Sequence, residues 1–237
     1  MAITHIGQDS EQNASGNTAD MTFTLPSHAT DDFGIISATV RNTGAAVAIG
    51  AASGWTELRS DTNTTGDTTV TYIWYKKFTS ASETNPTITI DLGRNRAFIG
   101  HVFRGVDTTT PFDVTEVFTK ISNASNPTNA AITTANANGC LLLTMGNTNG
   151  ELTALGVPAT PASLTAGAEA FAGGSNVDMV SCYKVDYGAA GTITPTAWTN
   201  TVTSSTGEAP CYTVALRAQA AAAASAPSYG RLLVNVG

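Results

Sequence analysis

The sequence predicts an all-β protein, a jelly-roll-like antiparallel β-sandwich. Apolar and polar residues alternate with a period of two in many short segments. Asn, Asp and Gly clusters suited to turns separate these segments, and helical periodicity is nearly absent. At 237 residues the chain is long enough for one large β-domain or two small ones.

The alternation is clearest in two short segments, residues 21–25 and 87–90. In the first, Phe23 and Leu25 share one face and threonines occupy the other. In the second, Ile88 alternates with threonines. Because successive side chains of a strand point to opposite faces, each segment is expected to place one face in a core.

The longest expected strand covers residues 69–78 and carries aromatic groups on both faces, which favours a central or interface position. Further strands are expected at residues 33–41, 55–59, 97–104, 112–119, 140–145, 179–185, 192–198 and 212–217. Turn sequences at 42–44, 65–67, 138–139 and 149–150 separate several of them. Residues 218–226 alone are helix-prone, and Pro227 ends that stretch.

An order of four features occurs twice, about 110 residues apart: an apolar strand, a Tyr-Lys strand, a Thr-rich strand and a strand ending in Arg. The first copy uses residues 35–40, 75–76, 87–90 and 103–104, and the second uses 141–143, 183–184, 192–196 and 216–217. This order suggests a sandwich built from a duplicated half, with halves at 20–125 and 126–217. The alternative is a chance alignment of two amphipathic β-sequences.

Composition argues against nucleic acid as a partner. Charged residues are only 12% of the chain, the formal net charge is -7, and the eleven Lys and Arg residues form no basic stripe. Neutral hydroxyls and amides dominate the expected surface, which suits a β-rich protein that packs against other proteins.

The N-terminal residues 1–16 lack the basic and apolar regions of a signal peptide, and no apolar run is long enough for a membrane span. We therefore expect a protein that stays in the cytosol until it is assembled. Cys140, Cys182 and Cys211 are expected to be buried thiols, with a Cys182–Cys211 bridge across neighbouring strands as the alternative.

The sequence contains no recognisable catalytic motif and implies no cofactor. His5, His28 and His101 have no partner at a metal-ligand spacing, and His101 is expected to have a packed or cross-strand role. The pairs Asp31-Asp32 and Asp107 with Asp113 could bind calcium, but hydrogen bonding to turn amides is the favoured interpretation. The rival class is a sandwich-fold glycosidase with two carboxylates facing each other across a groove.

Two tracts are candidates for binding. The first is aromatic, with Trp55, Tyr72, Trp74 and Tyr75 either packed in the core, as alternation favours, or exposed as a platform for glycans. The second is the C-terminal arm at residues 218–237, an Ala-rich tether followed by a short strand that could join the sheet edge of a neighbour or fold back. Its candidate assembly residues are Tyr229, Arg231, Leu232, Leu233, Val234 and Val236. Residues 1–19 are expected to form a similar N-terminal arm outside the body at 20–217.

Four motifs carry a resemblance to a known group: Gly-Trp-Thr at 54–56, Trp-Tyr-Lys at 74–76, Phe-Arg-Gly-Val-Asp at 103–107 and Pro-Phe-Asp at 111–113. Over residues 20–217 the chain resembles a diffuse family of β-sandwich virion and surface proteins of tailed bacteriophages. The motifs look architectural: Gly105 lets the chain turn, Pro111 starts a strand, and Arg104 can pair with Asp107 or Asp113.

The resemblance implies a virion or surface protein and carries over no catalytic residue. With the missing signal peptide, it leads us to expect a bacteriophage capsid decoration or cement protein that is not an enzyme. The expected partners are the major capsid protein, other virion subunits and further copies of the chain. The alternative is a tail or head-fibre adhesin that binds host surface glycans.

Overall fold

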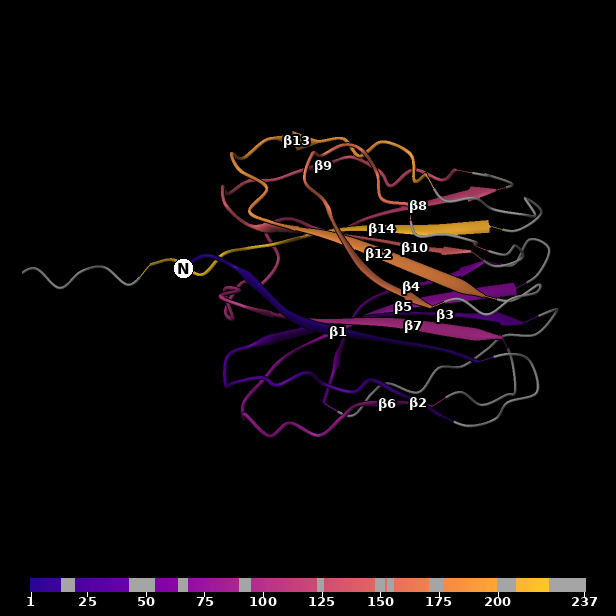
Figure 1. Ribbon diagram of the computed structural model, residues 1–237, viewed down its shortest axis with the longest axis horizontal. Helices are drawn as coiled ribbons and strands as arrows, with labels where there is room; N and C mark the ends of the chain where they lie inside the picture. The colour runs from indigo at the N-terminus through magenta and orange to yellow at the C-terminus, as the bar shows by residue number, and fades with distance from the viewer. Residues whose placement is uncertain are drawn as a thin grey trace, which may run out of the picture.

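The computed structural model describes residues 1–13, 20–42, 54–63, 68–89, 95–122, 126–147, 152, 156–170, 177–199 and 208–221. Within these ranges every regular element is a β-strand, and every strand pair is antiparallel. The strands form sheets that pack on one another, so the predicted all-β sandwich is confirmed (Figure 1).

The first half of the chain forms a five-stranded sheet and a small covering pair. The sheet order is β1-β7-β3-β5-β4. Its strands are β1 (Thr4–Asn13), β3 (Phe33–Asn42), β4 (Thr56–Asn63), β5 (Thr68–Lys77) and β7 (Arg96–Arg104). β2 (Met21–Thr22) pairs with β6 (Thr87–Ile88) as a separate layer. Phe23, Trp55, Trp74, Phe78 and Phe98 are buried between the two layers.

The second half repeats this plan. Its five-stranded sheet has the order β11-β12-β10-β14-β8. The strands are β8 (Val117–Ser122), β10 (Cys140–Asn147), β11 (Thr165–Ala170), β12 (Asp178–Val185) and β14 (Glu208–Leu216). β9 (Ile132–Thr133) pairs with β13 (Thr192–Ile193), and Leu141, Leu143, Val180, Cys182 and Trp198 fill the space beneath them.

The two halves have the same topology. Within the described residues each half contains seven strands, β1 to β7 and β8 to β14, which we number one to seven within the half. In both halves the five-stranded sheet has the order one, seven, three, five, four when read from its first strand, and strand two pairs with strand six. This nested pairing is consistent with jelly-roll winding. The four repeated features of the sequence fall on equivalent strands, β3 with β10, β5 with β12, β6 with β13 and β7 with β14. Asp31 and Asn138 both take positive φ just before the equivalent strands β3 and β10.

The change from the first sheet to the second falls between Arg104 and Val117, not at the expected 125/126 boundary, because β8 pairs with β14. Each half is also a small sandwich by itself, which differs from the expectation that two halves would together form one.

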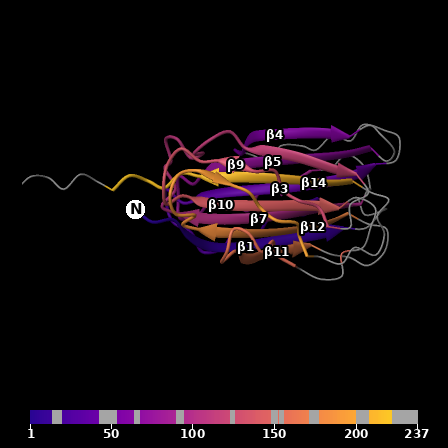
Figure 2. The same cartoon turned by 90° about the horizontal axis from the view of Figure 1, so that it is seen from above.

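The two five-stranded sheets pack face to face, so the molecule has four layers (Figure 1). A central core lies between them and includes Phe33, Ile35, Phe103, Leu142 and Val214. Figure 2 shows that the strands of both sheets run in nearly the same direction. β1 and β7 lie against β11 and β12, while Arg59 of β4 lies over Phe118 of β8.

This stacking relates the halves by a pseudo-twofold axis. The first strand of one half faces the fourth strand of the other half at both edges, β1 against β11 and β4 against β8, and the two third strands, β3 and β10, face each other at the centre. A twofold rotation about an axis that lies between β3 and β10, parallel to the strands, therefore exchanges the two sheets. The two edges of the central interface are therefore equivalent by symmetry, and differences between them come from their side chains.

The edges do differ. At the β1/β11 edge the sheets are close, because Ala97, Ala168 and Ala170 are small and pack with Ile99 and Met179. At the β4/β8 edge, bulky side chains hold the sheets apart and leave a groove. We call this feature the β4/β8 groove; its lining residues are Asp61, Thr62, Thr69, Thr71, Phe118, Lys120 and Pro210.

Several predicted elements need correction. Residues 4–13, expected in an N-terminal arm, form β1 at the edge of the first sheet and pair with β7. β11 was not predicted. The strand expected at 192–198 is only β13, and the one expected at 112–119 begins as β8 at Val117, with Phe112 forming an isolated bridge to Leu216. In the helix-prone stretch, the described residues 218–221 are not helical, and Ala218 bridges Val106.

Candidate functional site

The predicted corner residues brace the chain but do not form one cluster. Arg104 forms a bidentate pair with Asp32, with Nε–Oδ1 and Nη2–Oδ2 distances of 2.8 Å each. The expected pairing of Arg104 with Asp107 or Asp113 is therefore wrong. Asp32 is buried, follows the turn that leads into β3, and also accepts a hydrogen bond from the amide of Ala29.

Gly105 turns the chain, as expected. Its φ is 81°, and a Cβ atom at this position would overlap the carbonyl oxygen of Ala2. The carbonyl of Gly105 also accepts a hydrogen bond from Gln219 N at 2.8 Å. The N-terminus, this turn and the start of the C-terminal tether therefore meet at one end of the molecule.

The two remaining carboxylates cap turns. Asp107 accepts hydrogen bonds from the amides of Thr110 and Thr109, which lower its pKa, and it lies 3.6 Å from Arg217. Burial raises the pKa of Asp113, but hydrogen bonds from Asn136, Ala135 and Tyr187 outweigh burial and lower it.

Pro111 directly precedes the bridge residue Phe112, and its carbonyl accepts a hydrogen bond from Arg217 N at 2.8 Å. The favoured interpretation of these acidic residues, hydrogen bonding to turn amides, is confirmed for Asp32, Asp107 and Asp113. In the part of the chain that the structure describes, no group of three or more His, Cys, Asp or Glu side chains could hold a metal ion.

The aromatic tract is packed. Trp55 and Trp74 are buried in the core of the first half, so the favoured interpretation, packing in the core, is confirmed for them and they do not form an exposed glycan platform. Tyr72 stacks on Trp74 with ring centroids 5.1 Å apart, and Tyr75 packs on Phe33.

The cysteines are free and buried, and burial raises the pKa of each thiol. β10 separates the strands of Cys182 and Cys211, which rules out the alternative bridge across neighbouring strands.

A chain of polar side chains that the sequence did not reveal crosses the central interface, from the half-buried His5 to the buried Ser181. His5 Nε2 lies 3.1 Å from His101 Nδ1, and His101 Nε2 lies 2.9 Å from Ser181 Oγ. Ser181 Oγ in turn donates to the carbonyl of Ala168 at 3.1 Å. The sequence did indicate that His101 would pack within the body, but its partners come from β1 and β12, far away along the chain.

In this His5–His101–Ser181 chain, hydrogen bonds are donated in the direction opposite to that needed for a serine nucleophile. A serine hydroxyl has one proton, and Ser181 gives it to Ala168, so His101 Nε2 donates to Ser181 and His101 Nδ1 accepts from His5. A catalytic base must instead accept the hydroxyl proton. Ser181 and His101 are also buried, at 0% and 1% exposed. The arrangement joins strands and offers no reacting atom to a substrate.

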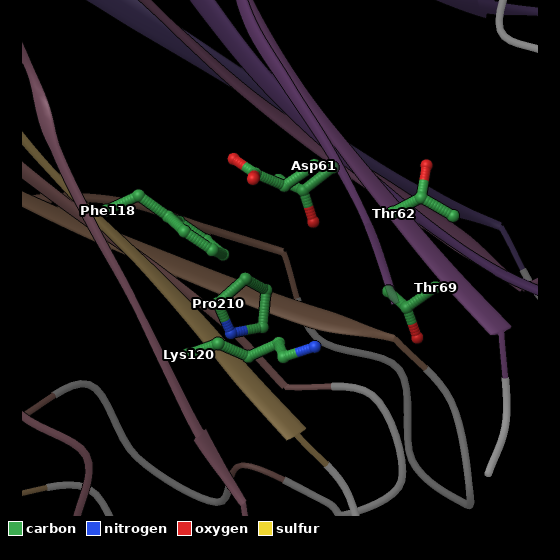
Figure 3. A pocket seen from close by; sticks show the side chains of 7 residues that line it. Asp61, Thr62, Thr69, Phe118, Lys120 and Pro210 are labelled. Carbon is green, nitrogen blue, oxygen red and sulfur yellow. The ribbon is translucent and has the colours of Figure 1, made fainter. Parts of the chain in front are cut away.

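The β4/β8 groove is a cavity of about 80 Å³ between the sheets, lined by both polar and apolar side chains. Figure 3 shows Asp61 and Thr69 of the first sheet on one side of the groove and Phe118, Lys120 and Pro210 of the second sheet on the other. Phe118 and Pro210 supply apolar walls, while the threonines supply hydroxyl groups. The groove can receive small side chains along an extended peptide more readily than a large rigid ligand.

The charged groups beside the groove are tied to one another. Arg59 pairs with Asp61, lies 3.7 Å from Glu116, and covers the ring of Phe118 at 5.0 Å. Asp61 also accepts a hydrogen bond from Tyr212 Oη at 3.0 Å, and burial, reinforced by this carboxylate, raises the pKa of that phenol. These contacts connect the two sheets across the interface.

The predicted assembly arm, Tyr229 with residues 231–236, lies outside the described residues. The described part of the tether runs to residue 221 and is anchored where the amino group of Met1 donates to Gln219. Among the described residues there is no helix long and apolar enough to cross a membrane.

Comparison of the chain with protein-family models, with curated proteins and with solved structures finds no significant match.

Proposed function

We propose that this protein is a structural component of a bacteriophage particle, a capsid decoration or cement protein without enzymatic activity. In this proposal it is made in the host cytoplasm and joins the major capsid protein, other virion subunits or further copies of itself. Its sheet edges and its C-terminal arm make the contacts.

The observation that carries the proposal is that, in the described residues, the main clusters of polar and charged side chains bond to one another within the fold. The His5–His101–Ser181 chain, the Arg104–Asp32 pair and the Arg59 network all connect parts of the fold to one another. A body braced in this way offers sheet edges to its surroundings, and unpaired sheet edges are where further strands add. The family resemblance and the low charge content support the same proposal.

The test uses the particles themselves. Virus-sized particles are purified on a density gradient from the culture that carries this gene, and peptides of the chain are sought by mass spectrometry. Deleting residues 227–237 is expected to leave the body folded and to reduce incorporation into particles. A matched control keeps the length of the arm but replaces Leu232, Val234 and Val236 with Ser; it should reduce incorporation similarly, because the apolar face is lost.

Absence of the chain from purified particles would contradict the proposal. If that result came with selective binding on a glycan array, it would favour the adhesin alternative.

A further inference from the structure

The four edge strands of the two large sheets are not equally protected. Three of them carry a β-bulge: β1 between His5 and Gly7, β4 between Glu57 and Arg59, and β11 between Ala166 and Glu169. Bulges distort an edge and discourage another strand from pairing with it. β8 pairs with β14 in unbroken register from Val117 to Ser122, so among the four edge strands, as far as the structure describes them, it is the one without a bulge.

The hydrogen-bonding groups of this edge can be assigned from its partner strand. Ala215 O accepts from Asp113 N, and Arg217 N donates to Pro111 O. The odd-numbered residues of β14 therefore direct their main-chain groups toward the β8 side. The β8 residues opposite odd-numbered residues are Val117, Thr119 and Ile121, which use their main-chain groups within the ladder.

It follows that the N–H and C=O groups of Phe118 and Lys120 point away from β14. Within the described ranges, no strand pairs with that side of β8. The side chains of these two residues line the β4/β8 groove. Val117, Thr119 and Ile121 are half-buried on the opposite face. A strand added here would place alternate side chains over the groove and over this half-buried face.

We propose that β8 accepts residues 231–236 of a second copy of this chain as an added antiparallel strand. The inference rests on the proposed function, because it names where the arm docks. The alternation of the arm matches the two faces. Leu232, Val234 and Val236 share one face, which suits the half-buried side of β8. Arg231, Leu233 and Asn235 share the other face, which suits a groove that combines apolar walls with the carboxylate of Asp61.

The course of the chain favours a second copy over the same one. Val117 lies opposite Thr213, so the tether leaves β14 at the end where β8 begins. An arm turning back from there would run parallel to β8, whereas every described strand pair is antiparallel.

An antiparallel return would require the tether to pass the full length of β14 first. The nine residues of β14 span about 30 Å, and residues 222–230 reach about 30 Å only when fully extended. A taut tether would leave no chain for the turn, so the arm of a neighbour is the better donor.

Cysteine cross-linking of full-length chains tests the proposal. One chain carries Lys120→Cys, an exposed position on the edge, and the other carries Leu233→Cys, the centre of the groove-facing side of the arm. The native thiols are buried with raised pKa values and do not compete. After mixing and mild oxidation, a disulfide-linked heterodimer is expected on a non-reducing gel.

The matched control moves the acceptor cysteine to Thr165→Cys, an exposed position on the bulged edge β11. The heterodimer should form about tenfold more efficiently with Lys120→Cys, because docking raises the local concentration of the arm. Equal cross-linking at both edges, or none at β8, would overturn the proposal.

A chain carrying both Lys120→Cys and Leu233→Cys, oxidised at high dilution, tests the same-chain alternative. A cross-link within one chain would overturn docking between copies. The readout needs no virus particle, so it separates this inference from the proposed function. Reduced incorporation of the arm deletion without cross-linking would place the arm on another virion protein.

Discussion

At the scale of single residues, the two histidines of the central interface are held in their neutral form. Burial lowers the pKa of His101 to about 3, with a further contribution from His5, and burial lowers the pKa of His5 to about 4. Protonating His101 would place a proton on Nδ1, which already accepts from His5. Tyr183 stacks on His5 and Phe103 packs beside it, so the rings around this pair supply no compensating negative charge.

The two pKa shifts predict acid-dependent stability. Both folded values lie below the unfolded value of 6.5, so the stabilisation is complete above pH 6.5 and is lost as the pH falls toward 4 and then 3. The free energy of unfolding should fall by about 2 to 4 kcal/mol from this pair between pH 7 and pH 4.5. Urea unfolding at a series of pH values measures the slope.

The variant His101→Gln should be less stable at pH 7 by about 1 to 2 kcal/mol but show a shallower slope, because it removes one titrating group. Equal slopes for His101→Gln and wild type would contradict the assignment.

Residue partners show what local sequence reasoning misses. Asp107 and Asp113 were the natural choices for Arg104 because they lie nearby in the chain, yet the observed partner is Asp32, 72 residues away. The pairing of β3 with β7 places Phe33, the neighbour of Asp32, opposite Phe103, the neighbour of Arg104. Strand register, which the sequence did not reveal, decides the partner.

At the scale of elements, alternation predicted the strands that are buried on at least one face. β3, β5, β7, β10, β12 and β14 all overlap their expected ranges. β1 was missed because its residues, Thr-His-Ile-Gly-Gln-Asp-Ser-Glu-Gln-Asn, are mostly polar and only half-buried at an edge. β11, Thr-Ala-Gly-Ala-Glu-Ala, was missed because Ala and Glu favour helices and its small side chains serve close sheet packing.

Two substitutions in β3, at Gly34 and Ser37, are expected to change the free energy of unfolding in opposite directions. A Cβ atom at Gly34 would lie 2.5 Å from Trp55 Cη2 and 3.0 Å from Phe78 Cε1, both on buried rings. Gly34→Ala should therefore lower the free energy of unfolding by about 1 to 3 kcal/mol.

The hydroxyl of Ser37 is buried in the central interface without a hydrogen-bond partner among the described residues. Removing that hydroxyl with Ser37→Ala should raise the free energy of unfolding by about 1 kcal/mol, because an unpaired polar group leaves the core. Chemical denaturation of both variants measures the difference. A stabilised Gly34→Ala would contradict the close packing of Gly34 against Trp55 and Phe78, and a strongly destabilised Ser37→Ala would contradict an unpaired hydroxyl at Ser37.

At the scale of the whole molecule, the chain joins two equivalent units through one interface. In the described residues the central core draws Phe33, Ile73 and Phe103 from the first half and Leu142, Tyr212 and Leu216 from the second. At the β1/β11 edge of this interface, small side chains allow the two sheets to pack closely. At the β4/β8 edge, Arg59 and Phe118 lie between the sheets and hold them apart. The fused arrangement thus allows two symmetry-related edges to differ: among the described residues, the groove and the edge strand without a bulge both lie at the β4/β8 edge.

The central core should hold the halves together even when the covalent connection is cut. Thr109 and Thr110 lie in an exposed turn between the two sheets, so a break there leaves every large-sheet strand intact. Co-expressed fragments 1–109 and 110–237 are expected to purify together in equal amounts, because each buries its central face only against the other. Either fragment expressed alone should aggregate or self-associate through that apolar face. The measurement is affinity purification of one tagged fragment followed by light scattering. Two fragments that are each soluble, monomeric and cooperatively folded alone would show that the central interface is not a shared core.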